Sequence, residues 1–269
     1  MRLGIPLALA AVVLLGCRPS PHPSPEPPTP PLERVTRVLD GDTVDLGAER
    51  IRLKGINAPE KGECGADKAT EALAALVAEG VRVDRRGTGD RGRTLGYLYG
   101  ADGTAIHTAL ARPGLVLAYP YGDNDDQAAA LAEAEQAARV EHLGLFDPHA
   151  CGPTLAVSAL IEISELVQNP PGDDLADGAG EYVAISGPAG TALSGWVIKD
   201  TSAGNRFSFP AGTVLPEGGA LRIYTGCGAA APDRLFWCRK GAGVWNNTGD
   251  TAFLLDPSGN LVDERATTR

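Results

Sequence analysis

Carboxylates and arginines that could act together on a phosphate ester occur in the first half of the chain. Asp40 and Asp42 flank a glycine at the tip of a predicted hairpin, and Glu60 follows the end of a later strand. Carboxylate oxygens, together with carbonyl oxygens, are the ligands that Ca²⁺ prefers. Arg52 and Arg93 carry guanidinium groups, which donate paired hydrogen bonds to phosphate oxygens. A further carboxylate such as Glu60 can orient or deprotonate water, so the residue types indicate metal-assisted hydrolysis of a phosphodiester.

Short strands and three helices are expected to position these residues. Apolar and polar residues alternate around the Asp-Gly turn, which predicts a hairpin, and helical spacing of Ala and Leu predicts amphipathic helices. We expect strands over 35–46 (the hairpin), 50–56, 81–83 and 94–99, and helices over 67–79, 107–112 and 126–142. This order is typical of a five-stranded Greek-key barrel with helices, the oligonucleotide/oligosaccharide-binding (OB) architecture.

Four motifs, in this order and spacing, resemble the staphylococcal nuclease (thermonuclease) family. They are VLDGDTV at 38–44, IRLKGINAPE at 51–60, DRGRTL at 90–95 and ALARPGL at 109–115. The resemblance covers about 33–148, and we place the domain at 33–150. It implies cleavage of DNA and RNA phosphodiesters on an OB barrel, with Ca²⁺ as cofactor.

The resemblance implies a metal site built from three residues. Asp42 matches the first metal carboxylate of the family, and Ala58 matches the residue whose backbone carbonyl is a ligand. Asn57 stands where the family most often has a second carboxylate, so one negative charge is lost. Because amide oxygens also bind Ca²⁺, we expect weaker metal binding rather than none. Asp40 either shapes the hairpin or lies in the outer shell of the metal.

The resemblance also assigns the residues around the phosphate. Arg52 and Arg93 match the pair that stabilises the pentacoordinate transition state, and Glu60 matches the residue assigned as general base. Tyr119 and Tyr121 match the aromatic pair that lines the nucleotide pocket. The alternative for both tyrosines is a packing role.

The N-terminal segment predicts export and a lipid anchor. Residues 1–17 have a positive start and an apolar stretch too short to span a bilayer, which is typical of a signal peptide. The stretch ends in Leu-Leu-Gly-Cys, which resembles a bacterial lipobox with Cys17 as the lipidated residue. The proline-rich segment 18–32 is expected to be an extended linker. The localisation expected is the cell envelope, with the outer membrane as one alternative and the membrane as a partner through Cys17.

The other four cysteines are expected to form two disulfides in an exported chain. Three pairings are possible. We favour Cys64 with Cys151 and Cys227 with Cys238, since each pair lies within one candidate domain or at its edge. A metal site is less favoured because the sequence has no CxxC pair with interleaved histidines.

Residues 155–269 read as an all-β domain. Seven short apolar runs separated by Gly- and Pro-containing turns predict a β-sandwich. The expected strands are 160–163, 182–185, 193–198, 206–209, 220–224, 251–255 and 261–263. Motifs such as GEYVAI at 180–185 and WNNTGD at 245–250 resemble the bacterial lamin-tail domain, an immunoglobulin-like sandwich. The resemblance implies an attachment or targeting module with an unknown ligand.

The net charge of the chain excludes one class of nucleic-acid-binding protein. The chain has 24 Lys+Arg and 34 Asp+Glu, a formal charge of −10, which excludes a protein that coats nucleic acid with a broad basic surface. We expect an exported, lipid-anchored, Ca²⁺-dependent nuclease acting on DNA, RNA or both, with no stable protein partner. The alternative is a catalytically weak or dead OB module, a surface lipoprotein that binds nucleic acid or glycan. The neutral Asn57 motivates that alternative, and Ca²⁺-dependent cleavage distinguishes the two.

Overall fold

A computed structural model describes residues 31–89, 92–119, 125–152, 160–202 and 204–267. The expected signal peptide, the lipobox Cys17, residues 18–30 of the expected linker and Tyr121 lie outside the described residues. In the part of the chain that is described, none of the helices has the length and apolar composition needed to cross a bilayer.

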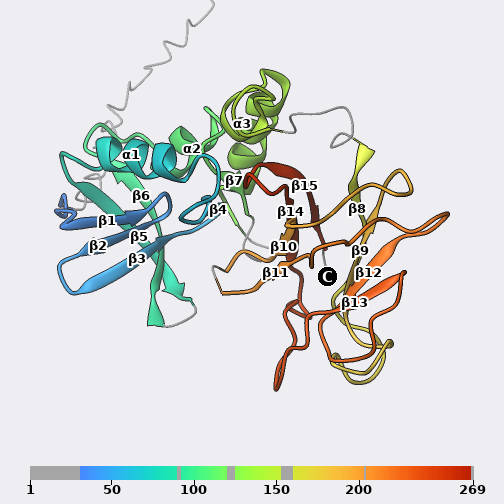
Figure 1. Ribbon diagram of the computed structural model, residues 1–269. Coiled ribbons are helices and arrows are strands. Elements are labelled where there is room, and N and C mark those ends of the chain that lie inside the picture. The colour runs from blue at the N-terminus through green and yellow to red at the C-terminus, as the bar shows by residue number, and fades with distance from the viewer. Residues whose placement is uncertain (1–30, 90–91, 120–124, 153–159, 203, 268–269) are drawn as a thin grey trace, which may run out of the picture. The chain divides into compact units, whose positions relative to one another are not determined.

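Five strands form the barrel that carries the candidate site (Figure 1). They are β1 (Arg37–Asp40), β2 (Thr43–Leu46), β3 (Glu49–Leu53), β5 (Val81–Thr88) and β6 (Thr94–Gly100). Their order in the sheet is β1-β2-β3-β6-β5, and only β3 and β6 pair in parallel among these neighbours. A bridge between Glu33 and Val81 joins the segment before β1 to the far edge strand.

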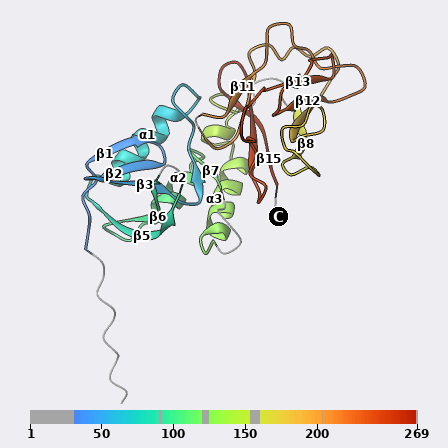
Figure 2. The same ribbon diagram turned by 90° about the horizontal axis from the view of Figure 1, so that it is seen from below.

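Three helices cover the barrel. They are α1 (Ala66–Leu76), α2 (Ile106–Ala111) and α3 (Ala128–Val140). Ala69 and Leu73 of α1 are fully buried in one apolar core with Val44 and Ile51 of the sheet. The view from below shows α3 beside α2 (Figure 2). Burial of one apolar face of each helix against the sheet is the main stabilising contribution to this domain.

Two features of the barrel differ from the sequence-based expectation. β5 reaches Thr88 instead of ending at 83, because its second half pairs with β6 across a bulge between Arg85 and Gly87. That half is exposed and charged, so it lacks the alternation that reveals a half-buried strand. A small second sheet, β4 (Ile56–Asn57) with β7 (Leu117–Ala118), was not expected, because two residues are too few to show a period.

The second half of the described chain is a sandwich of two four-stranded sheets, in the orders β11-β10-β14-β15 and β13-β12-β9-β8. The strands are β8 (Glu162–Val167), β9 (Tyr182–Ser186), β10 (Val197–Lys199), β11 (Arg206–Ser208), β12 (Leu221–Tyr224), β13 (Arg234–Phe236), β14 (Thr251–Leu255) and β15 (Leu261–Ala266). The expected mainly β architecture, an OB barrel with helices followed by an immunoglobulin-like sandwich, is therefore confirmed.

The sandwich core contains two tryptophans. Trp196 and Trp245 are buried with Ile198 and Leu254 between the sheets. The expected strand 193–198 begins only at Val197, because the preceding residues form a turn in which the Trp196 N–H donates to the Leu193 carbonyl.

An eighth strand, β13, lies in the insertion between Cys227 and Cys238, where no strand was expected. It pairs in parallel with β12. The disulfide between Cys227 and Cys238 closes this insertion. The second disulfide joins Cys64 to Cys151 with their Cα atoms 5.4 Å apart. The structure thus has the pairing that we favoured among three.

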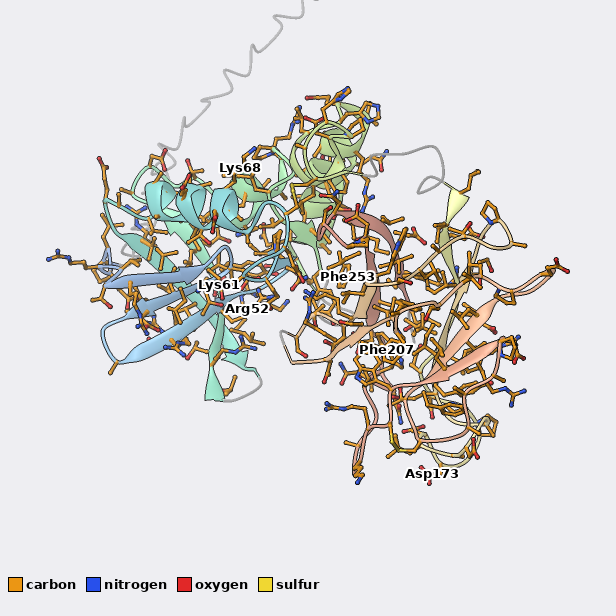
Figure 3. All side chains as sticks on the ribbon, viewed as in Figure 1. Arg52, Lys61, Lys68, Asp173, Phe207 and Phe253 are labelled. Atoms are coloured by element: carbon orange, nitrogen blue, oxygen red, sulfur yellow. A yellow bond between two sulfur atoms is a disulfide. The ribbon has the colours of Figure 1, made fainter. Side chains whose placement is uncertain are left out.

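From Pro31 onward the chain forms one compact unit that includes both the barrel and the sandwich. A small apolar core contains Leu117 and Leu145 from the first half of the chain together with Phe253 and Leu255 of β14. Phe253 is labelled in Figure 3. The barrel and the sandwich are therefore packed together rather than joined only by the chain between them.

Candidate active site

A cavity of about 220 Å³ lies where β2 begins and β3 ends. Six residues singled out from the sequence line it, namely Asp40, Asp42, Arg52, Glu60, Arg93 and Tyr119. They come from β1, the β1–β2 turn, β3, the segment after β4, the residues before β6 and the end of β7. The fold thus gathers residues that span about 80 positions of sequence into one cavity.

Asp42 is held in a fixed orientation at the floor of this cavity. Its side chain accepts the Ala58 N–H at 2.7 Å and the Thr43 hydroxyl at 3.0 Å. Gly41 permits this arrangement, since a Cβ there would lie 2.6 Å from the Ala69 Cβ and 2.7 Å from the Ala58 Cβ. Burial raises the pKa of Asp42 to about 6, against the opposing charge of Arg52.

Arg52 lies beside Asp42 because β2 and β3 pair in a register that sets Thr43 opposite Arg52. Its Nη2 is 3.0 Å from Asp42 Oδ2, and its Nη1 donates to the carbonyls of Leu53 and Ile56 at 2.8 Å each. The side chain, labelled in Figure 3, is only 13% exposed. The guanidinium is therefore pre-organised before any ligand binds.

Glu60 faces the same cavity from the segment after β4. Burial raises the pKa of Glu60, and the nearby Lys199 ammonium opposes that rise. The Glu60 N–H donates to Glu63 Oε2 at 2.7 Å, which fixes the backbone that carries the carboxyl group. A carboxylate in this setting can accept a proton from a water molecule in the cavity.

Arg93 and Tyr119 line the cavity from two further segments of the chain. Arg93 precedes β6, and its carbonyl accepts the Gly89 N–H at 2.8 Å. Tyr119 follows β7, and its N–H donates to the Gly55 carbonyl at 2.7 Å. Gly55 has a positive φ of 82°, a conformation that favours glycine. The aromatic ring and the guanidinium are the group types that stack on a base and bind a phosphate.

Comparisons with known proteins indicate which families the two halves of the chain resemble. A family model described as Staphylococcal nuclease homologue matches residues 50–147, and one described as Lamin Tail Domain matches 156–269. The chain is 35% identical over 133 residues to Protein ParB of Escherichia coli, covering 44% of this chain and 75% of that protein. It is 36% identical over 134 residues to Micrococcal nuclease of Shigella flexneri, covering 44% of this chain and 76% of that protein. An uncharacterized endonuclease of Escherichia coli O157:H7 is 37% identical over 118 residues, covering 42% and 75%.

The chain belongs to the staphylococcal nuclease homologue family. It is a nuclease, that is, a hydrolase of phosphodiester bonds, and its nuclease domain is followed by a lamin tail domain. Both family resemblances drawn from the sequence motifs are confirmed.

Asn57, the expected second metal ligand, lies next to the cavity of the nuclease domain. It is 4% exposed, and its Oδ1 accepts a hydrogen bond from Arg52 Nη2 at 3.3 Å. It lines a separate cavity of about 30 Å³ together with Glu63 and Lys199. Its role as a ligand therefore stays a prediction.

The carboxylates of this cavity have the chemistry that a hard divalent cation requires. Asp40 and Asp42 both line it, and Ca²⁺ binds carboxylate and carbonyl oxygens together with water. Within the described ranges no group of three or more His, Cys, Asp or Glu side chains could hold a metal ion. A cation at Asp42 therefore needs the Ala58 carbonyl and water to complete its coordination. A dication would also stabilise the ionised form of this buried carboxylate.

Three groups that the sequence analysis did not assign also belong to the cavity. Lys54 lines it, and its Nζ donates to Asp125 Oδ2 at 2.8 Å. Residues two positions apart in a strand point to the same face, and Lys54 lies two residues after Arg52. Strand alternation could therefore have placed Lys54 beside Arg52. Thr201 and Ser202 of the lamin tail domain line it as well. No local pattern in the sequence could connect these two residues to Asp42.

Proposed function

We propose that this protein is an exported, lipid-anchored nuclease that requires Ca²⁺ and hydrolyses phosphodiester bonds of DNA, RNA or both. The observation that carries the proposal is the gathering of Asp42, Arg52, Glu60 and Arg93 around one cavity. The calcium requirement is supported by the Asp40 and Asp42 carboxylates that line this cavity, because Ca²⁺ prefers carboxylate oxygens. A binding protein without catalysis has no need for a carboxylate and two arginines in this arrangement.

The side chains of the cavity have complementary roles in the proposed reaction. Arg52 and Arg93 bind the non-bridging oxygens and neutralise the charge that develops on the phosphorane. Glu60 accepts a proton from the attacking water, whose oxygen forms the new bond to phosphorus. The P–O5′ bond breaks, and the leaving oxygen takes up a proton. Ca²⁺ held by Asp42, Asn57 and the Ala58 carbonyl would add Lewis-acid stabilisation of the phosphate charge.

Tyr119 would stack on a base of the substrate at the edge of the cavity, with Tyr121 as its expected partner. Stacking of this kind contributes about 1–3 kcal/mol per base and tolerates any sequence. The lamin tail domain would attach the enzyme to a ligand that is not yet identified. The chain is acidic overall, and few arginines lie at the site. Both facts are compatible with a nuclease, because an enzyme must release its products and does not need to bind nucleic acid tightly over a broad surface.

Digestion of plasmid DNA and of RNA by the purified chain tests the proposal. Cleavage is expected with Ca²⁺ and is expected to stop when EDTA removes the metal. Cleavage that is equally fast in EDTA would refute the calcium requirement. Absence of cleavage of both substrates at any Ca²⁺ concentration would favour the binding protein instead.

Replacement of Asn57 by aspartate should strengthen Ca²⁺ binding. The variant restores a second negative charge, so the Ca²⁺ concentration for half-maximal activity is expected to fall about tenfold. Isothermal titration calorimetry of Ca²⁺ provides a second readout. Asn247→Asp, an exposed substitution in the lamin tail domain, is the matched control. An unchanged Ca²⁺ affinity in Asn57→Asp would mean that Asn57 is not a ligand.

Lipid anchoring depends on Cys17 in this proposal. Cys17→Ser removes the sulfur that carries the lipid, and the protein is then expected to leave the membrane fraction. Stable anchoring requires at least two lipid chains, so partial retention is not expected. Cell fractionation with immunoblotting measures the change. A Cys17→Ser protein that still sediments with membranes would refute the anchor.

A further inference from the structure

The lamin tail domain forms one wall of the nuclease cavity. Thr201 and Ser202, which follow β10, line the cavity together with Glu60. Asp200 fixes this wall, because its Oδ1 accepts the Ser202 N–H at 2.7 Å and the Ser202 hydroxyl at 2.8 Å. Asp200 is itself 5% exposed and also accepts from Asn205. The wall is therefore a rigid part of the sandwich.

Glu63 connects this wall to the segment that carries Glu60. Its Oε2 accepts the Glu60 N–H at 2.7 Å, and its Oε1 accepts from Lys199 Nζ at 2.9 Å and from Arg206. The side chains of Glu63 and Lys199 are only 7% and 2% exposed. With little water around them, the attraction between these two charges is screened less than in an exposed ion pair.

Other contacts keep the same two segments in register. The Cys64 N–H donates to the Gly259 carbonyl at 3.2 Å, one residue after Glu63. The disulfide between Cys64 and Cys151 fixes the end of this segment within the first half of the chain. Away from these two segments, Arg139 of α3 forms an ion pair with Glu264 of β15, which is a further contact between the nuclease domain and the sandwich. The Glu60 segment is thus held from both sides.

We propose that Lys199 and Arg206 of the lamin tail domain are positioning residues for hydrolysis, acting on Glu60 through Glu63. This inference rests on the proposed role of Glu60 as the residue that orients the attacking water. Both cations compensate the buried Glu63 carboxylate, and that carboxylate holds the Glu60 backbone in place. A displacement of about 1 Å at a reacting group can cost about 100-fold in rate. The lamin tail domain is therefore part of the active site as well as an attachment module.

Two measurements on the full chain test this positioning. Lys199→Met is expected to lower kcat at least tenfold on a single-stranded oligonucleotide while KM changes less than threefold. Hydrogen–deuterium exchange of the 58–64 backbone is expected to become at least tenfold faster, with no change in the β2 and β14 peptides. Lys199→Arg keeps a cation for Glu63 and should restore both values to within threefold of the original protein.

Lys240→Met serves as the matched control, because Lys240 is an exposed lysine of the same domain. If thermal melting shows that Lys199→Met does not fold, Arg206→Gln carries the same test at a side chain that is 34% exposed. Unchanged exchange or unchanged kcat in a folded variant would overturn the positioning role. If the original protein cleaves nothing, the proposed function fails, and unchanged exchange at 58–64 still decides against the Glu63 connection.

Discussion

Replacement of Arg93 by alanine is expected to lower kcat about 1,000-fold. Arg93 supplies positive charge to a cavity whose floor is the Asp42 carboxylate, and loss of an arginine that stabilises a phosphoryl transition state typically costs 10³–10⁵ in rate. Because Arg93 lies in the segment before β6 and outside the barrel core, folding should be preserved. Steady-state kinetics with a single-stranded oligonucleotide, together with thermal melting, measure the two effects separately.

Two further variants define the role of Arg93. Arg93→Lys keeps the charge but loses the planar fork, so an intermediate kcat is expected. Arg112→Ala is the control, since Arg112 forms an exposed ion pair with Glu141 outside the cavity and should leave kcat unchanged. Full activity of Arg93→Ala would remove Arg93 from the site and would leave Arg52 as the arginine assigned to the phosphate.

Replacement of Asp42 by asparagine is expected to remove Ca²⁺ binding and nearly all activity. The substitution keeps the shape of the side chain but removes the buried charge that the cation and Arg52 share. We expect Ca²⁺ affinity to fall at least 100-fold in isothermal titration calorimetry and kcat to fall by about 1,000-fold. Calorimetry supplies a readout that does not depend on turnover.

Asp45→Asn, on the strand β2 that follows Asp42, is the matched control. Asp45 pairs with Arg37 and Arg50 at the surface, where an ion pair contributes at most about 1 kcal/mol to stability. Its variant should keep both Ca²⁺ affinity and kcat. If Asp42→Asn binds Ca²⁺ as tightly as the original protein, the metal is held elsewhere and the proposed site is wrong.

The lamin tail domain of this nuclease contacts the active site. Residues on β10 and just after it contact both the Glu60 segment and the cavity, so removal of the sandwich is expected to disturb the active site. Lys199, Thr201 and Glu63 connect the lamin tail domain with the hydrolytic site. This arrangement would allow hydrolysis to depend on an intact C-terminal domain.

Local patterns in the sequence predicted most of the strands and helices. Strand alternation around Asp40 and Asp42, and helical spacing in the segment that became α1, depend on residues only two to four positions apart. Such periods reflect burial of one face, which the chain encodes locally. Where burial is absent, as in the charged second half of β5, or where a strand has two residues, as in β4, the pattern gave no signal.

The sequence alone determined which residue types could bind a phosphate and a cation. Asp42, Arg52, Glu60 and Arg93 have the required chemistry in any fold that brings them together. Only the tertiary structure decided which other groups join them. Glu63, Lys199 and Thr201 lie up to about 140 positions apart, and neither charge nor polarity at such a distance predicts a partner. Their contacts arise from the packing of the sandwich against the barrel, which depends on complementary surfaces rather than on any local period.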